Sequence, residues 1–575
     1  MRSLRIALAQ MNSTVGALAQ NREKICKMAA QASSAGAELV IFPELVLCGY
    51  PPEDLILKPH FIAAVDTELR LLSQALPPEV VCIVGSPSQG EQNPFNSAVI
   101  LYQGQVLGRY HKCQLPNYGV FDEYRVFKAG HSPLCLELNG ARIGIHICED
   151  SWVHSAEDAA CFAQAELSAV VNLSASPFHR GKLPERISIL KKTSAACKTP
   201  LFYCNLVGGQ DELVFDGGSM AISPEGEILV QAERFVEELL VFDLPIKENT
   251  TEPPAKLKTL SLTLPTHPKK PLAPRQRPRD LPELEEVYEA LKLGIRDYTD
   301  KNGFKTILIA ISGGIDSALV AALAVDAVGA ERVSGISLPT RYSSEGTRSD
   351  AILLAENLGI EMPMLPIQDL FTHYLDLLSP QFAGRDADVT EENLQARIRG
   401  SIVMALSNKF GSLVVATGNK SEMATGYATL YGDMCGGYAL IKDVPKTMVF
   451  DLCRWSNQQQ GFERIPQSLI DRPPSAELRD DQKDSDSLPP YEILDAILSL
   501  YIEQDLGRDE IVAKGFEYDI VTRVIRLVDG NEYKRRQSPP GVKITPKAFG
   551  RDRRVPITNH FRPTTPPQKS TCPKK

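Results

Sequence analysis

A strand, a glycine turn and the start of a helix follow one another directly in residues 307–324. The run Ile307–Ile311 is entirely apolar, which is typical of a buried parallel strand. Ser312–Gly314 interrupts it, and residues 317–324 have the composition and spacing of a helix. Glycines let backbone N–H groups approach an anion, and the first turn of a helix offers unpaired donors. This stretch therefore predicts an α/β domain with a phosphate-binding turn.

An acidic residue inside the turn helps to identify which class of phosphate-binding site this is. The turn has no Gly-Lys-Ser/Thr, so it is not a Walker loop, and it does not match a dinucleotide fingerprint. Asp316 would repel a bare phosphate, whereas a carboxylate there can hold a Mg²⁺ that bridges to the phosphates. The alternative is a glycine-rich turn that binds no ligand.

The stretch Ser312–Ser317 resembles the pyrophosphate-binding loop of the N-type ATP pyrophosphatases. That family splits ATP into AMP and pyrophosphate and adenylates a substrate oxygen on the way. The resemblance implies a Rossmann-like domain, and the repeated strand and helix patterns that follow the loop favour a doubly wound parallel sheet. It also implies that ATP contacts the loop residues Ser312, Gly313, Gly314, Ile315, Asp316 and Ser317.

The composition of the 575 residues is that of an ordinary globular chain, with 43% hydrophobic and 23% charged residues. A net charge of −9 and the lack of a basic stripe argue against a nucleic-acid partner. No apolar stretch has the length of a membrane span, and the apolar part of the N-terminus is too short for a signal peptide. The cysteines form no Cys-x-x-Cys pair, so we expect reduced thiols in a cytoplasmic protein.

The N-terminal half alternates apolar strands with helices, which predicts a layered α/β domain. Reactive groups in such domains gather beyond the ends of strands, and Glu44 and Cys148 each follow an apolar run. The predicted strands cover residues 4–8, 37–42, 80–84, 98–101, 105–110, 141–147, 169–173, 201–206 and 219–223.

One thiol, one carboxylate and one cation in this half suffice for acyl transfer from an amide. Cys148 is a candidate nucleophile, and Glu44 can serve as its base. Lys112 can lower the pKa of the thiol and stabilise an oxyanion. Each residue also has a non-catalytic interpretation. Cys148 could be a buried core residue, Glu44 could begin a loop, and Lys112 could be a solvated surface residue.

Phe42–Leu45, Tyr110–Pro116 and Cys148–Asp150 all resemble the nitrilase, or carbon–nitrogen hydrolase, family. The resemblance covers roughly the first 240 residues. It implies a four-layer αββα fold and a Glu-Lys-Cys triad made of Glu44, Lys112 and Cys148. In the glutaminase branch of the family, the matching contacts to glutamine are Tyr118, Ser176 and Lys182, the last of which is arginine in some relatives.

The second half resembles the NAD synthetases through motifs that occur in the right order, and the whole chain, to about residue 554, resembles the glutamine-dependent members of that family. The resemblance implies that Thr417 contacts ATP and that deamido-NAD contacts Asn393, Glu422 and Lys534. Asp316 and Glu422 are the implied metal ligands, and Glu422 cannot be assigned between metal and substrate. The motifs are Ser312–Ser317, Asn393–Arg397, Thr417–Glu422, Tyr431–Asp433 and Glu532–Gln537.

The order of these motifs predicts two catalytic domains. The expected glutaminase domain covers residues 1–245, and a Pro- and Lys-rich linker or wrapping arm without a core element covers 246–281. The expected synthetase domain covers 282–560 and begins with a helix at about 282–301. A disordered tail is expected at 561–575. The acidic, apolar-poor stretch 477–486 is expected to be a mobile surface loop.

The resemblance implies a ligase that uses ATP and Mg²⁺ to activate the carboxylate of deamido-NAD as an acyl-adenylate, which ammonia then converts to NAD. The ammonia comes from glutamine through a thioester at Cys148. We expect a homo-oligomer. The alternatives are another ATP-dependent glutamine amidotransferase, or a nitrilase-like binding module fused to an inactive nucleotide-binding domain. The second alternative is disfavoured by the presence of Glu44, Lys112, Cys148, Asp316 and Lys534.

Overall fold

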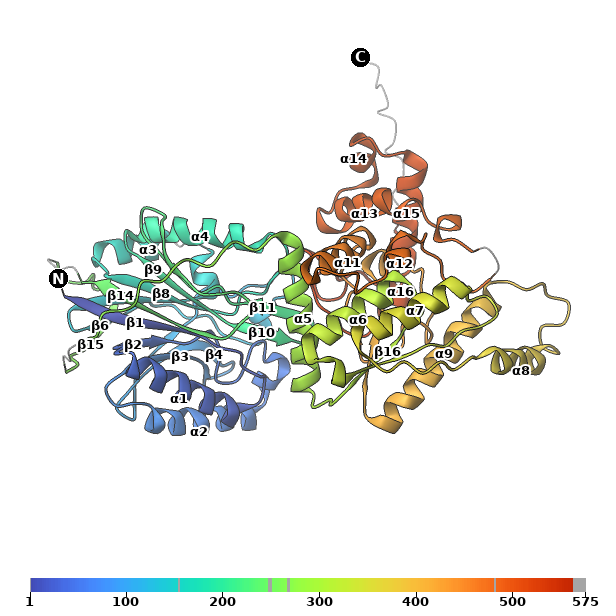
Figure 1. Ribbon diagram of the computed structural model, residues 1–575. Helices are drawn as coiled ribbons and strands as arrows, with labels where there is room; N and C mark the ends of the chain where they lie inside the picture. The colour runs from blue at the N-terminus through green and yellow to red at the C-terminus, as the bar shows by residue number, and fades with distance from the viewer. Residues whose placement is uncertain (1, 154–155, 247–250, 266–268, 480–481, 562–575) are drawn as a thin grey trace, which may run out of the picture. The chain divides into compact units, whose positions relative to one another are not determined.

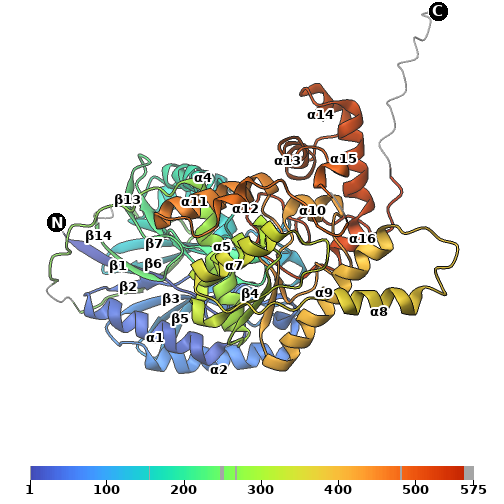
Figure 2. The same ribbon diagram turned by 45° about the vertical axis from the view of Figure 1, so that its right-hand side comes forward.

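The structure, a computed structural model, describes residues 2–153, 156–246, 251–265, 269–479 and 482–561 (Figures 1 and 2). The chain divides into two compact units, Met1–Lys301 and Asn302–Lys575. From residue 562 on, the expected tail lies outside the described residues. None of the described helices is long and apolar enough to cross a membrane.

Two β-sheets form the centre of the first unit, and each is covered by a pair of helices. The first sheet has the order β14 (Glu238–Pro245), β1 (Ser3–Gln10), β2 (Leu39–Ile41), β3 (Val81–Ser88), β4 (Phe95–Tyr102) and β5 (Gln105–His111). The second has the order β13 (Ile228–Gln231), β12 (Met220–Ile222), β9 (Leu201–Asn205), β8 (Ala169–Ser174), β7 (Ala141–Ile147), β6 (Leu134–Leu138) and β15 (Lys258–Leu262). A two-stranded sheet joins β10 (Val207–Gln210) and β11 (Leu213–Asp216).

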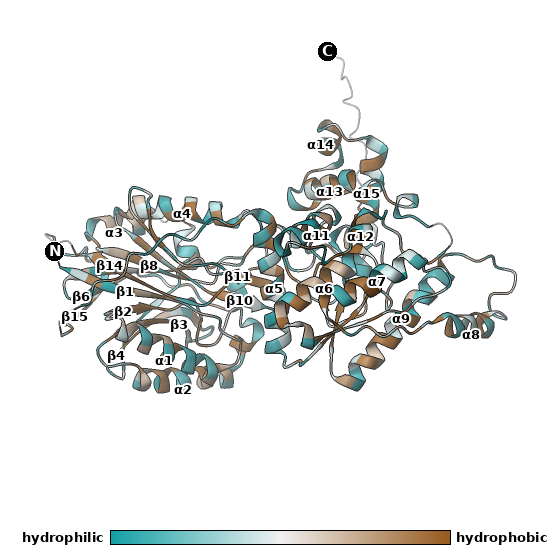
Figure 3. Cartoon of the chain, in the orientation of Figure 1, coloured by the Kyte–Doolittle hydropathy of each residue, from teal (hydrophilic) through white to brown (hydrophobic). Residues whose placement is uncertain are grey.

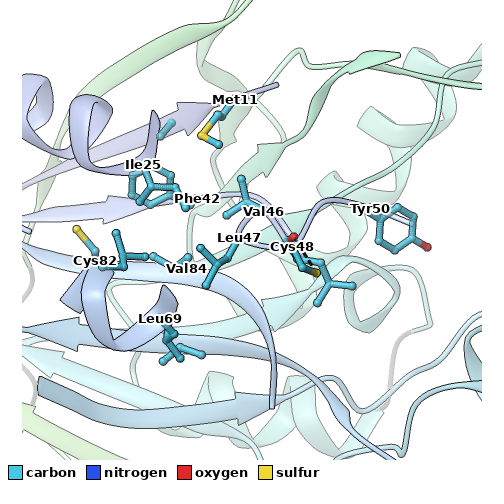
Figure 4. Packing of buried hydrophobic residues seen from close by; sticks show 14 of the residues in the cluster. Met11, Ile25, Phe42, Val46, Leu47, Cys48, Tyr50, Leu69, Cys82 and Val84 are labelled. Carbon is cyan, nitrogen blue, oxygen red and sulfur yellow. Dashed lines mark hydrogen bonds between the residues drawn. The ribbon is translucent and has the colours of Figure 1, made fainter. Parts of the chain in front are cut away.

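Alternation along the strands sends apolar side chains to both faces of these sheets. On β1, Ile6 and Leu8 enter the core between the two sheets, whereas Ala7 and Ala9 pack toward the helices. The helices on the first sheet are α1 (Leu18–Ser34) and α2 (Pro59–Ala75), and Figure 4 shows their side chains Ile25 and Leu69 among strand residues. Both helices carry polar and apolar faces in Figure 3.

The other pair of helices, α3 (Ala156–Gln164) and α4 (Lys182–Cys197), covers the second sheet through a third core that includes Phe162, Leu190 and Tyr203. The layers are therefore helix, sheet, sheet and helix, and the predicted four-layer αββα fold is confirmed.

Part of the expected linker belongs to a sheet, which corrects the expectation that residues 246–281 contain no core element. Strand β15 pairs in parallel with β6 from Lys258 with Leu134 to Leu262 with Leu138. A short strand in a proline-rich region carries no periodic signal, so the sequence does not reveal it. Helix α5 (Glu283–Lys301), expected at the start of the second domain, packs against β10 and β11 of the first unit.

The second unit is built on a four-stranded parallel sheet with the order β17 (Val333–Ile336), β16 (Ile307–Ala310), β18 (Leu413–Ala416) and β19 (Tyr438–Ala439). Leu308 packs with α8 (Gln368–Leu378) and α9 (Val389–Phe410) through a shared core. Its neighbours Ile307 and Ile309 are buried on the opposite face, where α6 (Ile315–Val328) contacts the sheet. Helices on both faces confirm the predicted doubly wound arrangement.

Further helices surround this sheet. A separate apolar core joins α10, α13 and α15. Their bounds, in chain order, are α7 (Glu345–Leu358), α10 (Lys420–Thr425), α11 (Lys446–Gln460), α12 (Gln467–Asp471), α13 (Tyr491–Leu498), α14 (Arg508–Ala513), α15 (Tyr518–Gly530) and α16 (Glu532–Arg535).

Candidate active sites

A lysine between two glutamates lies in the interior of the first unit. Lys112 Nζ donates to Glu44 Oε1 at 2.7 Å and to Glu123 Oε1 and Oε2 at 2.9 and 2.8 Å. The side chains of Lys112 and Glu44 have no exposed surface, and that of Glu123 is 5% exposed. Burial alone would lower the pKa of Lys112, but the carboxylates of Glu123 and Glu44 raise it well above its ordinary value. The lysine is therefore a fixed buried cation.

Both oxygens of Glu44 are held by neighbouring segments. Asn96 Nδ2, from β4, donates to Oε1 at 2.7 Å, and the backbone N–H of Ala175 donates to Oε2 at 3.0 Å. Glu44 follows β2 and Ala175 follows β8, so the ends of strands from the two sheets orient this carboxylate. Its place in the site is set before any substrate arrives.

Cys148 lies just beyond β7, in a short 3₁₀ turn, Cys148–Ser151, and is 3% exposed. Its φ angle is +43°, a conformation that L-residues other than asparagine and aspartate seldom adopt. Burial and the charge of Glu44 raise the pKa of the thiol well above its ordinary value, while Lys112 lowers it. The thiol is therefore protonated at rest, and its activation requires a base.

Glu123 is a member of this cluster that the sequence does not reveal. It lies in a short 3₁₀ turn, Glu123–Arg125, and accepts a hydrogen bond from Tyr50 Oη at 2.9 Å as well as those from Lys112. Burial raises the pKa of its carboxyl, and Lys112 opposes the rise. A single glutamate in a polar loop carries no pattern, so only its burial in the folded chain identifies it.

The three residues expected to contact glutamine lie near this cluster. Tyr118 Oη donates to both carboxylate oxygens of Glu149, at 3.2 and 3.0 Å. Lys182 Nζ lies 4.0 Å from the centre of the Trp152 ring and donates to Glu185 at 3.0 Å. Burial raises the pKa of Tyr118 and lowers that of Lys182, and a thiolate at Cys148 would raise both pKa values. The third residue, Ser176, is buried and follows Ala175.

A cavity of about 310 Å³ opens in the second unit beyond the ends of β16 and β18. The strand order reverses between these two strands, because β17 lies on one side of β16 and β18 on the other. Ligands of open parallel sheets bind at such a reversal. The cavity brings together eight of the predicted nucleotide-binding residues, which are Ser312, Gly313, Gly314, Ile315, Asp316, Ser317, Thr417 and Glu422.

The glycine turn in this cavity packs closely against the backbone of a neighbouring segment. Gly313 has a φ of +82°, and a Cβ at this position would come within 2.2 Å of the carbonyl oxygen of Thr347. Helix α6 begins at Ile315, so its first N–H groups face the same cavity. A phosphate group fits this arrangement of backbone donors at a helix N-terminus.

Two carboxylates and a lysine stand beside the turn. Lys446 forms an ion pair with Asp316 and lies 3.8 Å from Glu422. Asn419 Nδ2 donates to Asp316 at 3.0 Å. Burial and the charge of Asp316 raise the pKa of Glu422, while Lys446 lowers it. Lys446 and Arg399 also line the cavity, and neither was predicted from the sequence to belong to the site.

The residues present suit a Mg²⁺ ion. Mg²⁺ is usually held by one or two carboxylates, with water and substrate phosphates as the other ligands. Asp316 and Glu422 supply two such carboxylates, and each raises the energetic cost of ionising the other. Among the described residues, no group of three or more His, Cys, Asp and Glu side chains could hold a metal, so the phosphates would have to complete the shell.

Two residues expected to contact deamido-NAD do not line the cavity. Asn393 Oδ1 accepts a hydrogen bond from Thr429 Oγ1 at 2.7 Å, and Lys534 Nζ donates to the carbonyl oxygens of Gly426 and Ala428 at 2.7 and 2.9 Å. Ala428 does line the cavity, so Lys534 stands directly behind its wall.

The acidic stretch expected to be a surface loop forms part of the cavity wall in its described residues, 477–479 and 482–486. Glu477 accepts a hydrogen bond from Thr347 Oγ1 at 2.7 Å, and the Leu478 carbonyl accepts one from Gln395 Nε2 at 2.9 Å. Leu478 and Asp484 also line the cavity. These two hydrogen bonds hold the start of the stretch at the cavity although the stretch contains few apolar residues.

Two family models match the chain. The one described as carbon–nitrogen hydrolase matches residues 5–250, and the one described as NAD synthase matches residues 287–538. The first match covers the residues around Cys148, and the second covers the cavity with the glycine turn.

Curated relatives match over nearly the full length. The glutamine-dependent NAD(+) synthetase of Thermotoga maritima is 45% identical, over 98% of this chain and 100% of the relative. That of Synechocystis is 44% identical, over 97% of this chain and 99% of the relative.

Solved structures show the same architecture. A glutamine-dependent NAD+ synthetase from Acinetobacter baumannii, in complex with adenosine diphosphate, is 41% identical with a TM-score of 0.73, over 97% of this chain and 99% of that one. One from Cytophaga hutchinsonii is 22% identical with a TM-score of 0.80, over 97% and 98%, and shows the shared fold alone.

Proposed function

Because the chain belongs to the glutamine-dependent NAD(+) synthetases, we propose that it amidates deamido-NAD to NAD with one catalytic site in each unit. It is a glutamine-hydrolysing ligase with ATP as co-substrate. The observation that carries the proposal is the division of groups. The thiol with its base and buried lysine lies in the first unit, and the phosphate turn with its carboxylates lies in the second.

In the first unit, Glu44 takes the proton of Cys148, and the thiolate attacks the carboxamide carbon of glutamine. The Lys112 ammonium stabilises the oxyanion that forms. The C–N bond then breaks, and Glu44 returns the proton to the leaving nitrogen, which departs as ammonia. Water, deprotonated by Glu44, hydrolyses the thioester to glutamate and restores the thiol. Glu123 keeps Lys112 charged and fixes its direction throughout.

The groups around Cys148 can also distinguish glutamine from a simple amide. Lys182 offers a cation for the α-carboxylate, because its partner Glu185 lies on the same turn of helix and leaves the ammonium partly exposed. Glu149, which accepts from Tyr118, offers a carboxylate for the α-ammonium. The two opposite charges match the two charged groups of the substrate.

In the second unit, the glycine turn and the start of α6 bind the phosphates of ATP. The carboxylate of deamido-NAD attacks the α-phosphorus, which forms the acyl-adenylate and releases pyrophosphate. Ammonia attacks the acyl carbon, AMP leaves with the C–O bond electrons, and the new C–N nitrogen loses a proton to solvent to give the amide. A Mg²⁺ bound by Asp316 and Glu422 would neutralise charge on the leaving pyrophosphate. Lys446 adds a cation beside the same carboxylates.

The test is AMP release by the purified chain with deamido-NAD and with other acceptor acids, each with glutamine or ammonium as nitrogen source. We expect turnover with deamido-NAD and both nitrogen sources. Turnover with a different acid but not with deamido-NAD would identify another ATP-dependent glutamine amidotransferase instead. A cytoplasmic homo-oligomer remains part of the proposal, and cell fractionation and light scattering test it.

A further inference from the structure

The carboxylate of Asp150 accepts four hydrogen bonds in the interior of the first unit. Its Oδ1 accepts from the backbone N–H groups of Cys113 and Gln114, at 3.0 and 2.8 Å. Its Oδ2 accepts from the backbone N–H of Ile147 at 2.9 Å and from Tyr110 Oη at 2.8 Å. The residue is 7% exposed. Every lone-pair direction of this carboxylate is therefore used by a donor.

These four donors belong to two segments that carry catalytic groups. Cys113 and Gln114 directly follow Lys112, and Ile147 directly precedes Cys148. One oxygen of Asp150 thus holds the backbone behind the lysine, and the other holds the backbone in front of the thiol. Asp150 therefore links the two segments through hydrogen bonds to the backbone N–H groups of both.

The turn at Cys148 needs such support because its backbone is strained. A non-glycine residue at a φ of +43° costs on the order of 1–3 kcal/mol and persists only where its surroundings fix it. Asn172 Nδ2 holds the Cys148 carbonyl at 3.2 Å on the far side of the turn. Asp150 supplies the matching support on the near side, at the N–H of Ile147.

We infer that Asp150 is a positioning residue for glutamine hydrolysis, which locks the turn that presents Cys148 to the segment that presents Lys112. This inference rests on the proposed function of Cys148. The side chain of Asp150 has no hydrogen bond to those of Tyr118, Glu149, Ser176 or Lys182, which we assign to glutamine binding. Its removal should therefore impair the chemical step and leave substrate binding nearly intact.

The negative charge of Asp150 is essential to this role, because all four partners are donors. An asparagine in its place has one oxygen to accept, and its NH₂ group would face two of the donors. Burial raises the pKa of Asp150 to about 6, and the N–H groups of Ile147 and Gln114 oppose that rise. The carboxylate is thus ionised at neutral pH and can accept all four hydrogen bonds.

The experiment compares Asp150→Asn with Tyr110→Phe, which removes only one of the four donors, in the full-length chain. Steady-state glutamine hydrolysis gives kcat and KM, and ammonium-driven NAD formation reports on the second unit. For Asp150→Asn we expect kcat to fall by about 100-fold, the effect of an error of about 1 Å in catalytic geometry. The KM for glutamine should stay within about threefold, and ammonium-driven synthesis should not change. Tyr110→Phe should lower kcat by less than about tenfold.

A wild-type kcat for Asp150→Asn, or a raised KM with unchanged kcat, would overturn the inference. If near-ultraviolet circular dichroism shows that this variant does not fold, Tyr110→Phe decides: a lower kcat at unchanged KM supports the inference, and an unchanged kcat overturns it. Cys148→Ala separates the two proposals. If Cys148→Ala still hydrolyses glutamine, the proposed function of Cys148 is wrong. If Cys148→Ala loses glutamine hydrolysis but Asp150→Asn keeps full activity, only the proposed role of Asp150 is wrong.

Discussion

Each unit places a buried lysine between two carboxylates, but the two arrangements differ in their access to solvent. In the first unit, the side chains of Lys112 and Glu44 are fully buried and that of Glu123 is 5% exposed. In the second, Lys446 is 3% exposed, whereas Asp316 and Glu422 are 17% and 19% exposed. The same three charges are thus sealed in one unit and open to a cavity in the other.

This difference corresponds to two kinds of chemistry. A sealed cluster keeps its charges at fixed distances in a low-dielectric interior, which suits proton transfer to and from one thiol. An open cluster leaves carboxylate oxygens free to receive a cation and phosphates from a nucleotide. Breaking each cluster should therefore remove a different part of the overall reaction.

The largest effect is expected for Cys148→Ala. Glutamine-dependent NAD formation should fall by roughly 10⁴-fold or more, as for the loss of a covalent nucleophile. Ammonium-driven synthesis should persist and rise with pH as more free ammonia forms. The measurement is NAD formation by one purified variant with each nitrogen source. Loss of both activities in a folded protein would contradict the division between the units.

Asp316→Asn should remove synthesis with both nitrogen sources, by roughly 10³-fold, since several kcal/mol of charge stabilisation on the leaving group would be lost. Glutamine hydrolysis in the first unit should remain. The matched control is Asp326→Asn on the same helix, whose carboxylate pairs with Arg464 and does not line the cavity. Wild-type turnover of Asp316→Asn at low Mg²⁺ would show that the open cluster holds no catalytic metal.

Glu123→Gln tests the sealed cluster through the residue that the sequence does not reveal. We expect the kcat of glutamine hydrolysis to fall by about 10²-fold, because Lys112 loses the charge of one of its two carboxylate partners. Tyr50→Phe, which removes a single hydrogen bond to Glu123, serves as the control and should cost less than about tenfold. Equal kcat values for Glu123→Gln and wild type would show that the ion pair of Glu123 with Lys112 has only a structural role.

The smallest effect is expected for Lys534→Ala, which lies behind the wall of the open cavity. The KM for deamido-NAD should rise by about tenfold, equivalent to about 1.4 kcal/mol, with little change in glutamine hydrolysis. Arg536→Ala, in the same basic run but half-exposed and paired with Glu532, is the control. If steady-state kinetics show the same deamido-NAD parameters for Lys534→Ala and wild type, the lysine serves only the carbonyls of Gly426 and Ala428.

Elements with strong periodic signals could be predicted from the sequence. The strand expected at 141–147 is β7, and the helix expected at 282–301 is α5, within one residue. Both are long enough for burial to leave a clear apolar pattern. Two edge strands were not predicted: β14, at the end of the expected glutaminase domain, and β15, in the expected linker. An edge strand is stabilised by its neighbour more than by its own composition.

Site residues that lie in recognisable sequence motifs could also be predicted from the sequence. Glu44, Lys112 and Cys148 stand at strand ends within recognisable motifs, and the structure places them around one buried cluster. Glu123 and Lys446 lie in no recognisable sequence motif. Their positions depend on how distant segments fold together, which no short window of sequence encodes.

The pairing of β15 with β6 has a consequence for how the chain is made. Synthesis proceeds from the N-terminus, and domains generally begin to fold during synthesis. The second sheet of the first unit cannot be completed until residue 262 has left the ribosome, about 120 residues after β6 itself. Until then, β6 presents an unpaired edge that other chains could join. A gene fragment cut at residue 250 would carry that edge permanently, and its product should aggregate where a fragment that includes α5 stays dispersed.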